Sequence, residues 1–164
     1  GKNRVKSMAL IHQKLYQNDS GLVDFDEYIH LLIKELSTLY KSDNKINTRI
    51  LSKGMKFDVD TAIPLGLIIN EIITNSYKYA FNRGKENRLS ISINKQDKDN
   101  FKLIISDNGP GISGEFDIKK AKSLGLRLVN RLVKQLQGSL NLTNENGAKF
   151  EIFFKDVHAR QLID

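Results

Sequence analysis

Residues 64–81, PLGLIINEIITNSYKYAF, constrain the fold more than any other stretch of the chain. At about 100° per residue, their spacing predicts one long helix with a broad apolar arc. That arc carries Leu65, Ile69, Ile72, Ile73, Ser76 and Ala80. The same helix carries an acid and two amides, Glu71, Asn70 and Asn75, in surroundings rich in Ile and Leu. Polar groups this close to a core need hydrogen-bond partners.

Glu71, Asn75 and Lys78 stand at i, i+4 and i+7, and therefore stack along the arc opposite the apolar one, with Thr74 beside them. A carboxylate one turn from a carboxamide is typical of hard-cation chemistry, in which oxygen ligands and waters surround the ion. The same row is also typical of an amphipathic helix whose polar face meets solvent. This stretch alone does not separate the two interpretations.

The remaining hydrophobic pattern alternates between helical and extended periods. Helices are predicted over residues 2–17 and 24–40, at the central stretch from Asp60 or Thr61, and from Ser123 to Gly138. Strands are predicted over residues 46–52, 55–59, 89–93, 101–107, 139–143 and 148–154, with Asn146-Gly147 as a hairpin turn between the last two. Asp24 is the expected N-cap of the second helix, whose apolar side includes Phe25, Ile29, Leu32, Ile33, Leu36 and Leu39.

This order lacks a regular βαβ rhythm and predicts an α+β fold. We expect a two-layer α/β sandwich, in which one mixed sheet has helices on one face and the first two helices are an addition to it. The chain of 164 residues fits one such unit with a small appendage.

Composition narrows the function classes only modestly. No apolar run is long enough to span a membrane, and the absence of cysteine excludes disulfides and thiolate sites. We expect a cytoplasmic location, which leaves open a membrane attachment through segments outside this sequence. The net charge of +7 favours acidic partners such as nucleotide phosphates, although most basic residues are spread over the sequence and predict a solvated surface.

Asp107 ends a predicted strand on the same side as Phe101, Leu103 and Ile105. A carboxylate on an inward face needs hydrogen-bond donors, and the exocyclic amine of a nucleobase is one candidate. In the DNGPG sequence that follows, Gly109 and Gly111 allow unusual backbone angles and a close approach to a ligand. A plain Asn-Gly hairpin turn is the alternative, but residues 112–122 do not alternate as a returning strand would.

The sequence SLGL, residues 123–126, opens a helix after a lysine-bearing segment. Backbone N–H groups at the start of a helix suit phosphate oxygens, and Lys119, Lys120 and Lys122 would add positive charge. Taken alone, this motif is better explained by an ordinary serine cap with incidental lysines. No Walker A sequence is present, so a P-loop site is not indicated.

In combination, these motifs resemble the ATP-binding domain shared by histidine kinases, type II topoisomerases, mismatch-repair ATPases and the large heat-shock chaperone, the GHKL or Bergerat fold. The resemblance covers about residues 46–155. NEIITNSYKYAF is similar to the N box of HWE-like sensor histidine kinases, and AIPLGLIINE and SLGLRLVNRLV match the same class. SMALIHQKLY is similar to the second helix of their dimerisation element.

The resemblance implies a role for each matching position. It implies ATP and Mg²⁺ as ligands, Asn75 as the metal ligand, and Glu71 as the residue that polarises an attacking group or orders the metal shell. Lys78 would reach a phosphate, Tyr79 would lie against adenine, and Asp107 would accept a hydrogen bond from the adenine amine. Gly109 and Gly111 would admit the purine, Gly125 and Leu126 would offer N–H groups to phosphates, and residues 112–122 would form the ATP lid. Ala148 departs from the family, which often has Ser or Thr at that position.

The resemblance also predicts the organisation and partners of the chain. Residues 1–44 would be part of the dimerisation element with a connecting helix, residues 45–156 the catalytic domain, and residues 157–164 a tail. The expected partners are the phosphoacceptor histidine helix of the same or a partner subunit in a homodimer, and a response regulator receiver domain, but no nucleic acid. None of His12, His30 and His158 fits the acceptor pattern.

Two other functions stay open at this point. One is an ATPase of the same fold that uses Glu71 to activate water. The other is a non-catalytic module that binds a protein partner or nucleic acid through the same scaffold. The joint presence of Glu71, Asn75 and Asp107 favours a working nucleotide site over the second of these.

Overall fold

The computed structural model describes Ala9, which is helical and exposed, and residues 21–40, 45–81, 85–111, 124–144 and 146–156. The elements run in the order β1 (Leu22–Asp24), α2 (Phe25–Leu39), β2 (Ile46–Leu51), β3 (Lys56–Asp58), α3 (Val59–Tyr79), β4 (Asn87–Lys95), β5 (Asn100–Asp107), α4 (Leu124–Gln135), β6 (Ser139–Asn144) and β7 (Ala148–Lys155). The predictions for the rest of the helix over 2–17, for the cap at Ser123, for segment 112–122 and for the tail concern positions outside these ranges.

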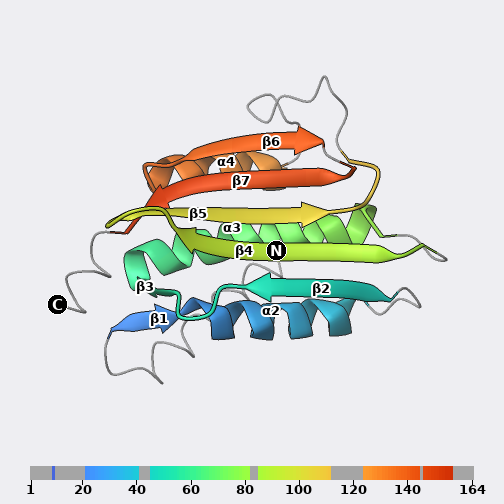
Figure 1. The fold of residues 1–164 in the computed structure, drawn as a ribbon, viewed down its shortest axis with the longest axis horizontal. Coiled ribbons are helices and arrows are strands. Elements are labelled where there is room, and N and C mark those ends of the chain that lie inside the picture. The colour runs from blue at the N-terminus through green and yellow to red at the C-terminus, as the bar shows by residue number, and fades with distance from the viewer. Residues whose placement is uncertain are drawn as a thin grey trace.

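The main sheet has five strands in the order β2-β4-β5-β7-β6, and Figure 1 shows α3 and α4 together behind it. β2 pairs with β4 in parallel, whereas the β4–β5, β5–β7 and β6–β7 pairs are antiparallel. β1 and β3 form a separate antiparallel pair. The predicted mixed sheet with helices on one face is confirmed.

Strand alternation explains why only one face of the sheet is covered. The strand residues that point toward the helices are buried. They are Leu89, Ile91 and Ile93 of β4 and Leu103 and Ile105 of β5. The residues between them are polar or only half-buried, which leaves the opposite face open. A period of two with one apolar side is what an antiparallel sheet with a single covered face requires.

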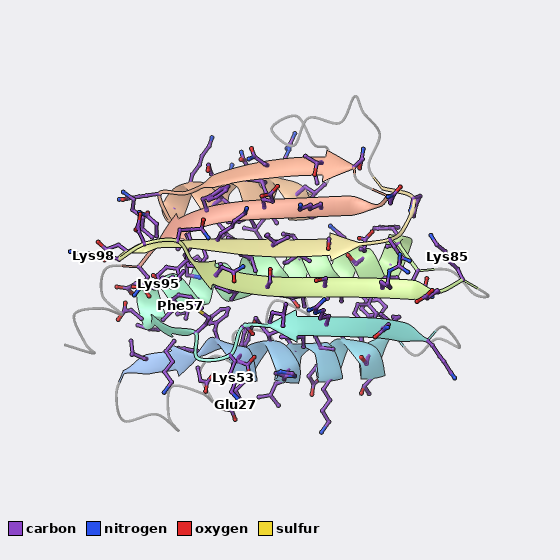
Figure 2. All side chains as sticks on the ribbon, viewed as in Figure 1. Glu27, Lys53, Phe57, Lys85, Lys95 and Lys98 are labelled. Atoms are coloured by element: carbon purple, nitrogen blue, oxygen red, sulfur yellow. The ribbon has the colours of Figure 1, made fainter. Side chains whose placement is uncertain are left out.

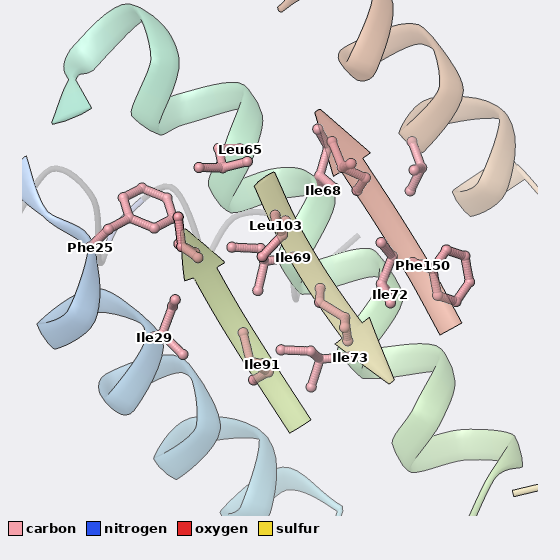
Figure 3. Packing of buried hydrophobic residues seen from close by; sticks show 14 of the residues in the cluster. Phe25, Ile29, Leu65, Ile68, Ile69, Ile72, Ile73, Ile91, Leu103 and Phe150 are labelled. Carbon is pink, nitrogen blue, oxygen red and sulfur yellow. The ribbon is translucent and has the colours of Figure 1, made fainter. Parts of the chain in front are cut away.

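The central helix α3 supplies much of the core (Figure 3). All six residues of the predicted apolar arc are buried: Leu65, Ile69, Ile72, Ile73, Ser76 and Ala80. The helix begins at Val59, slightly before the predicted start at Asp60 or Thr61, because the Asp58 side chain caps it by accepting a hydrogen bond from Asp60 N at 3.0 Å. Among the helices in the described ranges, none combines the length and apolar character needed to cross a membrane.

Helix α2 is part of the same core, although we expected it as an addition to the sheet. Its N-cap is Asp24, as predicted, and its buried residues are Phe25, Tyr28, Ile29, Leu32 and Leu36. Phe57 of β3 is fully buried and lies between α2 and the sheet, with its ring centroid 5.4 Å from that of Phe25 and 5.0 Å from that of Phe101 (Figure 2). The expectation that Leu39 packs inward was wrong: this last residue of the helix is 50% exposed.

Candidate functional site

The candidate site lies at the end of the sheet where β5 finishes, beside the C-terminal half of α3. Lys85 marks this end in Figure 2, opposite Lys95 and Lys98 at the β4–β5 turn. The Lys85 Nζ donates to the Asn108 carbonyl at 2.5 Å. Asn108 also ties β5 to the start of β4, because its Oδ1 accepts from Arg88 N at 2.7 Å and its Nδ2 donates to the Glu86 carbonyl at 2.6 Å.

Asp107 ends β5 on the inner face, as predicted, and its carboxylate is held by three donors. Oδ1 accepts hydrogen bonds from Gly109 N at 3.0 Å and from Ala148 N at 3.3 Å. Oδ2 accepts a hydrogen bond from the Ser76 hydroxyl at 2.9 Å. The carboxylate thus joins β5, the following turn, β7 and α3. A half-buried carboxylate needs hydrogen-bond donors, and the protein itself supplies them.

A cavity of about 360 Å³ opens beside this carboxylate. It is lined by Ile72, Asn75, Ser76, Tyr79, Ala80, Asp107, Pro110, Gly111, Leu126, Ala148 and Phe150. Apolar side chains make most of the wall, and a few polar groups converge on it, which is the usual composition of a small-molecule site. A volume of this size lies at the lower end of the range of small-molecule sites.

A larger hollow of about 740 Å³ lies near the same end of the sheet. Its lining includes Arg49, Arg88 and Lys149, together with Asp107 and Asn108, but no residue of α3 or α4. We assign the candidate site to the smaller cavity, because residues from α3, β5, α4 and β7 converge there.

Five predicted site residues line the cavity: Asn75, Tyr79, Asp107, Gly111 and Leu126. Tyr79 is 72% exposed, so its ring forms an open side wall that could lie against a planar ligand. Gly109 donates its N–H to Asp107 from just outside the lining. Its missing side chain serves packing, because a Cβ atom there would stand 2.6 Å from the Ala80 Cα.

Glu71, Lys78 and Gly125 do not line the cavity. Glu71 is half-buried one turn before Asn75, and Lys78 is exposed on the same side of α3, so the predicted polar row exists. Gly125 lies in the first turn of α4 next to Leu126. The first N–H groups of a helix have no intrahelical acceptors.

Ser76 was not predicted as a site residue. We placed it on the apolar arc of the helix, where a small hydroxyl residue is compatible with a packed core. Its position on the inward arc, directly after Asn75, was the available signal. Its partner Asp107 is 31 residues away in the sequence, so only the tertiary fold brings the pair together.

The residues that line the cavity fit a metal ion that binds together with a ligand and has few protein ligands of its own. Within the described ranges, no group of three or more His, Asp or Glu side chains could hold a metal ion. Asn75 is half-buried and lines the cavity wall. Mg²⁺ binds oxygen ligands, usually keeps several waters and takes further ligands from substrate phosphates, so a site with few protein ligands suits it.

Comparison with known proteins agrees with this architecture. A model of the "Histidine kinase-, DNA gyrase B-, and HSP90-like ATPase" family matches residues 60–158, and a "Histidine kinase" model matches residues 1–40. The sensor histidine kinase PdtaS of Mycobacterium tuberculosis is 28% identical over 141 residues, which cover 85% of this chain and 28% of that protein. Blue-light-activated histidine kinase 2 of Erythrobacter litoralis is 25% identical, with 85% of this chain and 42% of that protein covered.

Among solved structures, the histidine kinase domain of the Erythrobacter litoralis EL346 blue-light activated kinase superposes with a TM-score of 0.84. It is 21% identical, and the match covers 99% of this chain and 77% of that one. The present chain therefore spans 28% and 42% of the two curated relatives but nearly matches the fold of an isolated kinase domain. Because these family models match residues 60–158 and 1–40, the chain belongs to the histidine kinase-, DNA gyrase B- and HSP90-like ATPase family, in the sensor histidine kinase branch.

Proposed function

We propose that this chain is the catalytic part of a sensor histidine kinase, which binds ATP with Mg²⁺ and presents the γ-phosphoryl group to a histidine. The proposal rests on the observation that Asn75 and Asp107 line one and the same cavity. One wall offers a metal ligand and the other offers a carboxylate suited to the adenine amine. The phosphoryl group would then pass to an aspartate of a response regulator receiver domain.

The two ends of the nucleotide would be recognised by different elements. Asp107 of β5 would accept a hydrogen bond from the adenine amine, and the Tyr79 ring would lie against the base. The carboxamide of Asn75 would hold Mg²⁺ together with phosphate oxygens and waters. The bound ion would supply neutralisation of phosphate charge, which is the main requirement of phosphoryl transfer.

Predicted residues of α3 and α4 would act on the phosphates. Lys78 would supply a positive charge from the end of α3, and Gly125 and Leu126 would supply N–H groups from the start of α4. Glu71 stands one turn from Asn75 and would order the metal shell or polarise the attacking group. These roles put phosphate binding between two helices and base binding against the sheet.

The chain is expected to bind ATP without labelling itself. The relatives are longer than this chain, and we propose that the acceptor histidine belongs to a dimerisation helix of the same or a partner subunit. None of His12, His30 and His158 fits an acceptor pattern. Incubation with γ-labelled ATP should leave all three unlabelled, and a labelled histidine would contradict this part of the proposal.

Nucleotide titration tests the proposal directly. ATP should bind more tightly with Mg²⁺ than without it, and Asn75→Ala should remove most of that difference. Asp107→Ala should weaken ATP binding by about tenfold or more, because a hydrogen bond to a charged acceptor contributes about 1.5–3 kcal/mol. Asn94→Ala, an exposed amide on β4, is the control and should bind as the unaltered chain does. If the chain has no affinity for ATP, a non-catalytic binding module becomes the better explanation.

An ATPase that uses Glu71 to activate water would have a different signature. It would turn over ATP rapidly in the absence of any acceptor histidine, and Glu71→Ala would abolish that turnover. We expect slow hydrolysis instead, because residues 1–40 match a "Histidine kinase" family model, which favours a kinase over an ATPase.

A further inference from the structure

We propose that Ser76 is the residue that positions the Asp107 carboxylate for adenine and thereby sets discrimination against guanine nucleotides. This inference rests on the proposed function, because it assigns a determinant of specificity within the same cavity. Ser76 is 4% exposed, lines the cavity together with Asp107, and bonds to it at 2.9 Å.

The acceptor positions of Asp107 are mostly filled by the protein itself. A carboxylate offers about four lone-pair positions, two on each oxygen. The backbone N–H groups of Gly109 and Ala148 occupy both positions on Oδ1. The Ser76 hydroxyl occupies one position on Oδ2. One acceptor position on Oδ2 therefore remains for a ligand in the adjoining cavity.

The single hydroxyl hydrogen of Ser76 has two acceptors within reach. They are the Asp107 carboxylate at 2.9 Å and the Ile72 carbonyl of the preceding helical turn at 3.4 Å. The shorter bond to a charged acceptor is the stronger one, so the hydrogen is committed to Asp107. Ser76 can then offer only lone pairs to a ligand. Serine and aspartate together make an edge that accepts hydrogen bonds and donates none.

An edge of this kind separates the two purines. Adenine carries an amino group, a donor, at the position where guanine carries a carbonyl oxygen, an acceptor. The adenine amine can fill the free position on Oδ2, whereas the guanine oxygen would face two acceptors and leave them unpaired. Unpaired buried polar groups are the usual source of strong discrimination between similar ligands.

Ala148 of β7 explains why the hydroxyl comes from α3. It flanks the same carboxylate and gives it a backbone N–H, but its methyl side chain has nothing to donate. The family resemblance puts Ser or Thr at this position in many relatives. In the described part of this chain, Ser76 is the one side-chain hydroxyl bonded to Asp107, and it reaches the other carboxylate oxygen, Oδ2.

The test compares dissociation constants for Mg·ATP and Mg·GTP, measured by calorimetry on the whole chain. Ser76→Ala should lower the preference for ATP over GTP by about tenfold, which corresponds to a difference of about 1.4 kcal/mol. Ala148→Thr in the Ser76→Ala background should restore part of the preference, because it returns a hydroxyl to the same carboxylate. Ser106→Ala, at the residue next to Asp107 on the open face of β5, is the matched control and should change neither constant.

Other outcomes would overturn the inference. If Ser76→Ala lowers both affinities equally, or lowers stability without changing the ratio, then Ser76 only supports the helix. Alanine is the strongest helix former, so we expect this variant to fold. Ser76→Cys, of similar size but with a weak donor, gives a second measurement that should fall between serine and alanine. If the unaltered chain binds neither nucleotide, the proposed function itself fails, which is a different result from an unchanged ratio in a chain that binds ATP.

Discussion

Gly109 lies so close to Ala80 that a Cβ atom at position 109 would stand 2.6 Å from both the Cα and the Cβ of Ala80. Ala80 is the C-cap of α3, and Gly109 follows the last residues of β5. The turn that donates an N–H group to Asp107 is therefore fitted against the end of the helix that carries Ser76 and Asn75. Packing between helix end and turn fixes the distance between the two proposed halves of the nucleotide site.

Gly109→Ala should destabilise the chain by about 1–3 kcal/mol, the usual range for overpacking, and should weaken ATP binding as well. The added methyl group must push the turn away from Ala80 and lengthen the bond from Gly109 N to Asp107. Urea unfolding and nucleotide titration measure the two effects. Pro110→Ala, at an exposed neighbour in the same turn, should change stability by less than about 1 kcal/mol. A Gly109→Ala chain with unaltered stability and affinity would show that the turn can shift freely.

The second prediction concerns the boundary at residues 44 and 45 that the sequence suggested. Phe25, Tyr28 and Ile29 of α2 are fully buried, and Phe57 contacts Phe25 from the other side of that proposed boundary. A chain that starts at residue 45 would lack these residues and expose Phe57, and truncation of even one large buried aromatic side chain costs about 3–5 kcal/mol. We expect such a chain to lose cooperative unfolding in urea, whereas a chain of residues 21–156 keeps it. Cooperative unfolding of residues 45–156 alone would support the suggested boundary.

The periodicity of apolar residues predicted those parts of the fold that depend only on local sequence. The apolar arc of α3 and the inward side of β5 followed from burial patterns that repeat every 3.6 or 2 residues. The same period of two correctly put Asp107 on the inner face of its strand. The Ser76–Asp107 pair could not be predicted in this way, because it depends on how α3 lies across β5.

The end of α4 shows how a correct sequence signal can have a different physical cause. The sequence predicted that this helix ends at Gly138, and glycine commonly ends a helix through its backbone freedom. The residue with positive φ is instead Gln137, at 55°, and Gly138 N donates to the Val133 carbonyl at 3.0 Å. Glycine is required at 138 because a Cβ atom there would collide with the carbonyl oxygen of Phe153.

The third prediction concerns the ion pair between Lys102 and Glu151 on the open face of the sheet. The Lys102 Nζ lies 2.9 Å from the Glu151 carboxylate, and this hydrogen bond lowers the pKa of Glu151 below its ordinary value. Because the folded-state pKa is lowered, the pair stabilises the fold above the ordinary carboxyl pKa, and this contribution is lost as pH falls through the folded-state value.

Lys102→Met should therefore raise the Glu151 pKa toward its ordinary value, measured by NMR titration of its carboxyl carbon. The two side chains are 26% and 20% exposed, so salt should weaken the effect. Lys95→Met, at an exposed lysine on β4, is the control and should leave the Glu151 pKa unchanged. A Glu151 titration curve that does not respond to Lys102→Met would show that the ion pair does not persist in solution.

The last prediction concerns two buried polar residues of α3 that the proposed site does not use. Asn70 and Thr74 are 1% and 5% exposed, and their side-chain polar atoms have no hydrogen-bond partner among the described residues. A buried polar group without a partner costs about 1–3 kcal/mol, whereas an apolar group of the same shape does not. Thr74→Val keeps the shape of the side chain and removes the hydroxyl, so it should raise the free energy of unfolding by about 1 kcal/mol or more.

Thr38→Val on α2 provides the matched control, because that exposed hydroxyl donates to the Lys34 carbonyl at 3.1 Å and its loss should change stability by only a few tenths of a kcal/mol. Asn70→Leu tests the neighbouring amide in the same way and should also stabilise the chain. Lower stability of both variants would mean that the two side chains have partners in solution, either ordered water or residues outside the described ranges. Higher stability with unchanged ATP affinity would separate this pair from the proposed nucleotide site.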